Sequence, residues 1–227
     1  MLFRSLGVRP LRGRAGRGGN RRLARRGLYP VAGLVETLED RTLLSVQFVF
    51  DYSYDTAGFF GDSDRQDVLE QAAADLGSRM YDRLDDLAAS GGNTWSADFD
   101  DPATGILTSE VDLVVPADTL YVFAGARDLG GTAVGRGGYG GFSASGDSDW
   151  VDRVRARGQD GALLVAPTDF GPWGGSITFD TLTNWHFGST STGLDSGEID
   201  FYSVAVHELG HLLGISNVNP SWTQWVN

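Results

Sequence analysis

Three residues near the C-terminal end of the sequence, His207, Glu208 and His211, have types and a spacing that suit hydrolysis with a bound metal ion. Residues four positions apart lie on one face of a helix, so both imidazoles can be directed at a single ion. Neutral imidazole is a preferred ligand of zinc, and a catalytic zinc ion keeps one position for water. Glu208 can accept a proton from that water as general base. The pattern therefore predicts a hydrolytic zinc site on a helix.

The helix that must carry this motif is expected over residues 195–214. Asp195 and Glu198 have the spacing of a capping box, and Gly214 stands where a helix would end. Apolar residues between these ends recur at helical spacing and are expected to form the buried stripe: Ile199, Tyr202, Val206 and Leu213.

The rest of the chain is expected to supply a sheet and a second long helix. Alternating or β-branched segments predict strands at 46–51, 110–115, 119–124 and 174–180. Apolar residues from Leu69 to Leu87 predict a long helix that ends at Gly91-Gly92, and 147–158 is expected to be a short helix. The glycine-rich residues 130–146 are expected to form a loop. The predicted fold class is α+β, with a sheet packed on two main helices.

The run VAVHELGHLLG, from Val204 to Gly214, resembles the zinc-binding helix of metzincin metallopeptidases, and of the matrixins in particular. The segment GGSITFD at 174–180, followed by Trp185, resembles the matrixin strand that precedes this helix. The resemblance implies a zinc-dependent endopeptidase with a twisted, mixed and mainly parallel sheet. It also implies that a peptide substrate adds to an antiparallel edge strand in the glycine-rich region up to Ser143. His207 and His211 would bind zinc, with Glu208 as general base.

The sequence departs from the matrixin pattern after this helix. The position expected for the third zinc-binding histidine is Asn217, and the only methionines, Met1 and Met80, cannot form the expected methionine turn. The lower subdomain is expected to be missing or minimal. Two hypotheses follow: the chain is an N-terminal piece of a longer enzyme, or it is a catalytically inactive surface or binding module. Asn217 and His186 are the substitute ligands that the chain itself offers.

Calcium binding is a second implication of the resemblance. Asp180 matches a carboxylate of a matrixin calcium site, but the acidic residue expected three positions later is Thr183. Thr178 stands where a structural-zinc histidine would fall. Zinc is therefore the expected cofactor, and calcium is a possibility that the sequence leaves open.

Charge divides the chain into two predicted regions. The first 26 residues hold nine of the 18 arginines and no acidic residue, whereas the whole chain has a net charge of −12. We predict an arginine-rich, disordered leader or export segment over residues 1–45 and a metzincin-like metallopeptidase domain over 46–227. A disordered basic tail without an export role is the alternative for the first 26 residues. The string LEDRTLLS at 38–45 resembles the leader of exported bacterial surface proteins, which favours a secreted or cell-surface location.

The same composition limits the partners of the chain. An acidic domain repels phosphate backbones, so we expect no nucleic-acid partner. No apolar run is long enough to predict a membrane span. The absence of cysteine excludes disulfides and thiolate ligands. The expected partner is a peptide or protein substrate, bound by a monomer.

Overall fold

The computed structural model describes residues 45–188 and 190–223, so that nearly all of the predicted leader lies outside the described residues. None of the helices in this described part is both long and apolar enough to span a bilayer. The strands are β1 (Gln47–Asp51), β2 (Thr94–Asp100), β3 (Leu107–Val111), β4 (Thr119–Arg127), β5 (Gly135–Tyr139), β6 (Gly141–Ser145), β7 (Gly174–Asp180), β8 (Trp185–His186) and β9 (Ile199–Asp200). The helices are α1 (Ser63–Gly77), α2 (Ser148–Ala156), α3 (Phe201–Leu212) and α4 (Pro220–Thr223), with short 3₁₀ turns at Phe59–Gly61 and Asp160–Leu163.

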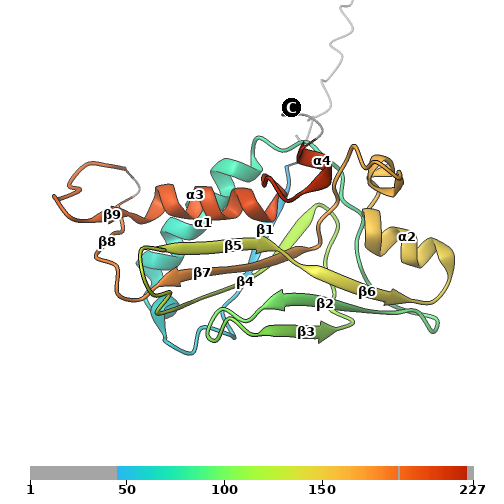
Figure 1. Cartoon of the computed structure of the whole chain (residues 1–227), viewed down its shortest axis with the longest axis horizontal. Coiled ribbons are helices and arrows are strands. Elements are labelled where there is room, and N and C mark those ends of the chain that lie inside the picture. The colour runs from blue at the N-terminus through green and yellow to red at the C-terminus, as the bar shows by residue number, and fades with distance from the viewer. Residues whose placement is uncertain (1–44, 189, 224–227) are drawn as a thin grey trace, which may run out of the picture. The chain divides into compact units, whose positions relative to one another are not determined.

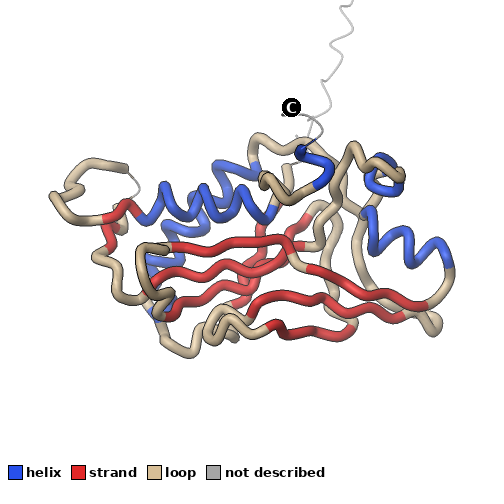
Figure 2. Tube along the Cα trace, viewed as in Figure 1, coloured by secondary structure: helices blue, strands red, loops and turns tan. Residues whose placement is uncertain are grey.

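The main sheet has four strands in the order β1-β4-β7-β5 (Figure 1). β1, β4 and β7 are parallel, and β5 pairs antiparallel with β7 at one edge. β2, β3 and β6 form a separate antiparallel sheet in the order β3-β2-β6, and β8 and β9 form a two-residue parallel pair (Figure 2). This mixed, mainly parallel sheet packs on two helices, α1 and α3, which agrees with the coarse prediction of a mixed sheet on two main helices.

The main sheet is buried on both faces, as its β4 strand shows. Successive residues of a strand point to opposite faces. Val122 and Ala124 face the core between the sheet and helices α1 and α3, whereas Phe123 faces the small sheet. On that second face Phe123 stacks on Phe99, with ring centroids 4.0 Å apart. Burial on both faces explains why β4 reads as a continuous apolar run.

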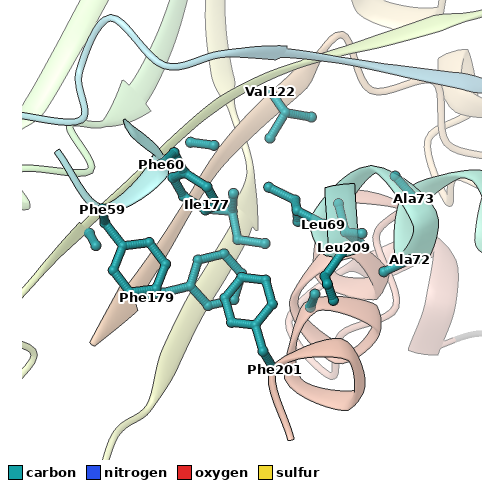
Figure 3. Close-up of a cluster of buried hydrophobic side chains, with 14 of the residues drawn as sticks. Phe59, Phe60, Leu69, Ala72, Ala73, Val122, Ile177, Phe179, Phe201 and Leu209 are labelled. Atoms are coloured by element: carbon teal, nitrogen blue, oxygen red, sulfur yellow. The ribbon is translucent and has the colours of Figure 1, made fainter. Parts of the chain in front are cut away.

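An aromatic cluster fixes the start of α3 (Figure 3). Phe201 packs 4.4 Å from Phe179 and 5.3 Å from Trp185, measured between ring centroids. The predicted buried stripe of this helix is wrong in part, because Ile199 precedes the helix and is exposed. The residues of α3 that are buried in this core are Phe201, Ala205, Leu209 and Leu212.

The predicted N-cap of this helix is also wrong. Asp195 and Glu198 do interact, since the Asp195 backbone N–H donates to the Glu198 carboxylate at 3.0 Å, but they close a turn before the helix. α3 is capped by Asp200, whose carboxylate accepts from the Ser203 backbone N–H at 3.1 Å. A carboxylate at this position satisfies a helix N–H that has no partner within the helix.

The predicted helix from Leu69 to Gly91 is too long. α1 ends at Gly77, and Leu87 instead exchanges backbone hydrogen bonds with Val115 at 2.8 and 2.9 Å. Leu87 is fully buried, but in the cluster beneath the small sheet. Apolar periodicity thus identified buried residues correctly, and tertiary pairing decided their backbone conformation.

The glycine-rich region predicted as a loop over 130–146 contains two strands, β5 and β6. The resemblance had placed an edge strand here, and β5 is that antiparallel edge. β2 was not predicted, although its alternation of Trp95, Ala97 and Phe99 with polar residues is a strand signal. The predicted strand at 110–115 lies earlier, as β3, whereas the strands at 46–51, 119–124 and 174–180 and the helix at 147–158 are confirmed.

A buried arginine fastens the end of α2 to the sheet. Arg157 is fully buried and adopts a left-handed backbone conformation with φ of 48°. Burial lowers the pKa of its guanidinium to about 10, so the group stays charged at neutral pH. It donates to four backbone carbonyls, those of Asp85, Pro116, Thr119 and Pro172. The loops around the start of β4 are therefore held by a single side chain.

Candidate functional site

α3 carries His207, Glu208 and His211 on three of its last six positions, and it packs along the edge strand β5 (Figure 1). The two imidazole rings are neighbours, with centroids 4.8 Å apart and planes 85° apart. His207 is exposed and His211 is half-buried. The structure thus brings the two predicted ligands together on one helix face, as their spacing requires.

A backbone hydrogen bond determines which nitrogen of His211 is available. Its Nδ1 lies 2.9 Å from the carbonyl oxygen of Ile215. A carbonyl only accepts, so in this contact Nδ1 is the donor, and in the neutral ring Nε2 then keeps its lone pair. Histidines that bind metal commonly donate their other ring N–H in this way. The sequence pattern gave no signal for Ile215, because only its backbone takes part.

The turn after α3 places that carbonyl. Gly214 has φ of 81°, and its N–H donates to the His211 carbonyl at 3.1 Å. The Ile215 N–H donates to the Gly210 carbonyl, also at 3.1 Å. These two bonds form a Schellman motif, which favours glycine at the left-handed position. The prediction that Gly214 ends the helix is confirmed.

Glu208 is buried between α3 and β5, with a side chain that is 7% exposed. Two glycines of β5 make room for it. A Cβ atom on Gly137 would lie 2.4 Å from the Glu208 carbonyl oxygen, and one on Gly135 would lie 2.8 Å from its carboxylate. The alternate glycines of β5 are thus the positions where the helix approaches the strand most closely.

Burial raises the pKa of the Glu208 carboxyl above its usual value. The neighbouring His207 and His211 oppose this shift, as does a hydrogen bond from the Gly137 backbone N–H. The balance favours a carboxyl group that binds a proton more readily than an exposed glutamate. An upward shift of the pKa is the direction that favours a general base.

The outer edge of β5 offers backbone groups to an extended peptide. The Asp180 N–H donates to the Val134 carbonyl oxygen, and the Gly140 N–H donates to the Gly174 carbonyl oxygen. The even-numbered residues along β5 therefore direct their backbone N–H and C=O groups toward β7. In an antiparallel pair this orientation alternates. Gly135, Gly137 and Tyr139 therefore direct their backbone groups away from β7, and β5 is the last strand of the sheet. Of these groups, the Gly137 N–H already donates to Glu208.

No contact in the described residues places either substitute ligand at the histidine pair. His186 lies in β8 and pairs with Asp200, the residue before α3. Asp200 precedes His207 by seven residues, which is about 10 Å along the helix axis at 1.5 Å per residue. His186 interacts with Glu198 at 3.5 Å. Asn217 is exposed in the loop after Gly214. Over residues 45–188 and 190–223, no cluster of three or more His, Cys, Asp or Glu side chains is arranged to hold a metal ion.

Asp180, the residue matched to a calcium ligand, is engaged by the protein itself. Its carboxylate accepts from the backbone N–H groups of Leu129 at 2.9 Å and Leu182 at 3.0 Å, and from the Thr183 hydroxyl at 2.8 Å. Thr183 thus binds Asp180 directly at the position where a second acidic ligand was expected. These contacts close the turn after β7 and give no indication of a calcium site.

Comparison with protein-family models gives one match relevant to this geometry: residues 148–221 match the matrixin model. This stretch is matrixin-like. It includes β7 and the whole of α3, and hence the histidine pair. The match agrees with the resemblance that the motif and the preceding strand had indicated. Comparisons with curated proteins and with solved structures give no match.

Proposed function

We propose that the chain is a zinc-dependent endopeptidase of the matrixin type, with zinc bound by His207 and His211. The observation that carries the proposal is the pair of neighbouring imidazoles beside a buried glutamate, within the matrixin-like stretch. The contact between His211 and Ile215 supports it, because Nε2 is left free to bind a metal. Two imidazoles fit a zinc ion, and the remaining ligand is proposed to come from outside the described residues.

Each group in the site has a distinct part in peptide hydrolysis. Bound zinc would act as a Lewis acid and lower the pKa of water. Glu208 accepts a proton and returns it to the leaving amine, a task for which its raised pKa is suited. The free edge of β5 orients the substrate by pairing with its backbone.

The wider assignments belong to this proposal. We place the enzyme in a secreted or cell-surface location because of its arginine-rich leader and the LEDRTLLS string. The proposed partner is a peptide or protein in extended conformation. The metallopeptidase domain is proposed to span residues 46–227, and calcium has no proposed role.

A zinc titration of the metal-free full chain tests the metal site. We expect stoichiometric binding that is lost in His211→Ala. His186→Ala is the matched control, because it removes the remaining histidine of the chain without touching the pair, and it should bind zinc as the wild type does. Equal zinc binding by all three proteins would contradict the assignment of the ligands.

Peptide cleavage tests the role of Glu208. With zinc supplied, cleavage of an unstructured peptide mixture should fall by at least about a hundredfold in Glu208→Gln, the scale at which general-base catalysis contributes. Zinc binding should persist in this variant, because Glu208 is not a ligand. Zinc binding without any cleavage by the wild type would support the alternative of an inactive binding module.

A further inference from the structure

The loop that follows α3 is closed by the side chain of Asn219. This side chain is almost completely buried, and its Nδ2 donates to the Gly214 carbonyl oxygen at 2.8 Å. Its Oδ1 accepts from the Ser221 backbone N–H at 3.1 Å, which caps the short helix α4. The Asn219 N–H donates to the Ser216 carbonyl. One asparagine therefore joins the end of the histidine helix to the start of the next helix.

The closed loop also fits tightly against the rest of the fold. A Cβ atom on Gly214 would lie 2.3 Å from Asn219 Nδ2 and 2.6 Å from the ring of Phe170. The Ser221 hydroxyl donates to the Asp169 carbonyl at 2.7 Å, so both ends of the loop contact the same neighbouring segment. Between these ends, Ile215 and Val218 remain exposed.

This loop contains the carbonyl that faces His211. The Schellman motif fixes the N–H of Ile215, but the direction of its carbonyl depends on the peptide that follows. That peptide lies within the loop that Asn219 closes. Asn219 is thus connected to His211 through two hydrogen bonds: Asn219 to Gly214, and Ile215 to His211.

We propose that Asn219 is a positioning residue for the metal site. By closing the loop, its amide holds the Ile215 carbonyl against His211 Nδ1, so that Nε2 is the nitrogen presented to a metal ion. The role of Asn219 in metal binding rests on the proposed zinc function. The effect on the ring of His211 exists in the metal-free protein as well, and it can be tested there.

The choice of variant separates positioning from capping. Asn219→Ser keeps a hydroxyl that can cap α4 but lacks an N–H that reaches Gly214. Asn219→Asp keeps the shape and the capping oxygen and also lacks the donor, so it replaces the serine variant if that fails to fold. Ser221→Ala is the matched control: it removes a hydrogen bond from the same segment and leaves the contact with Gly214 intact.

The decisive measurement is the tautomer of His211 by nitrogen-15 NMR of the metal-free full chain. We expect the Nδ1–H form in the wild type and in Ser221→Ala, and a mixture of both tautomers in Asn219→Ser. In the zinc titration, Asn219→Ser should bind about 10- to 100-fold more weakly than the wild type, as for other outer partners of metal-binding histidines.

Two results would overturn the proposal. One is a folded Asn219→Ser variant in which His211 stays in the Nδ1–H form, because the loop would then hold Ile215 without the amide. The other is an equal change in Ser221→Ala, which would make the effect one of general stability. Failure of the wild type to bind zinc would count against the proposed function alone, since the NMR result does not depend on metal.

Discussion

Two buried carboxylates, one at the end of β7 and one on α3, have pKa values that are shifted in opposite directions. Asp180 and Glu208 are each 7% exposed. Burial raises the pKa of both, but for Asp180 the hydrogen bonds from Leu129, Thr183 and Leu182 outweigh it and the net pKa is lowered. For Glu208 the effect of burial prevails and the pKa is raised.

The two carboxylates differ in how deeply they lie within the protein and in the supply of backbone donors. Asp180 ends a strand, where the N–H groups of the following turns have no ladder partner and point at its carboxylate. Glu208 lies inside a helix, where the neighbouring N–H groups are used by the helix itself. Its carboxylate instead accepts from the Gly137 N–H of β5. Two residues of equal solvent exposure thus hold carboxylates whose pKa values are shifted in opposite directions.

The largest effect is expected from removing the satisfied carboxylate. Asp180→Ala leaves two backbone N–H groups and the Thr183 hydroxyl without their acceptor, which should cost on the order of 2 to 4 kcal/mol of unfolding free energy. Asp128→Ala is the control, because Asp128 is exposed and its carboxylate accepts from the Gly130 backbone N–H in a local turn. It should cost less than about 1 kcal/mol. Urea unfolding of both variants measures the difference, and equal costs would contradict the assignment.

A smaller effect is expected from crowding the helix at Glu208. Gly137→Ala places a methyl group 2.4 Å from the Glu208 carbonyl oxygen, so β5 and α3 must separate. Such overpacking should cost about 1 to 3 kcal/mol. Gly138→Ala, on the next residue, meets no atom within 4 Å and should be close to neutral. Thermal unfolding compares the two, and similar melting temperatures would show that the strand and helix are not in tight contact.

The smallest effect is a difference in pH dependence. A raised folded-state pKa favours the native state while Glu208 is protonated, and that contribution is lost as the pH rises through the folded-state pKa. Glu208→Gln should therefore become more stable relative to the metal-free wild type as the pH increases from about 4 to about 8. Asp180→Asn should become less stable relative to wild type as the pH rises from about 2 to about 4, because the folded-state pKa of Asp180 is lowered below 3.8 and the stabilising contribution of its ionised form is complete above that value. Melting temperatures measured as a function of pH test both expectations. If both variants gained, or both lost, melting temperature relative to wild type as the pH rose, the contrast between the two carboxylates would be contradicted.

Much of the site was predictable because its chemistry is local. The four-residue spacing placed His207 and His211 on one helix face, and Gly214 ended that helix with the expected left-handed turn. The missing signals were contacts made by backbone atoms and by glycines. The residue type at position 215 gave no indication that its carbonyl contacts His211. Gly135 and Gly137 were visible in the sequence, but only the structure shows that they allow α3 to pack closely on β5.

The sequence by itself determined the chemical groups, their spacing and the strands whose side chains alternate, because these depend on residue type and on the periods of helix and strand. Only the tertiary structure decided where α1 ends, that Asp200 caps α3, and that the glycine-rich region forms an edge strand. It also decided the opposite pKa shifts of Asp180 and Glu208. Those outcomes depend on which backbone donors and which surfaces meet across long sequence separations, and a linear pattern contains no such information.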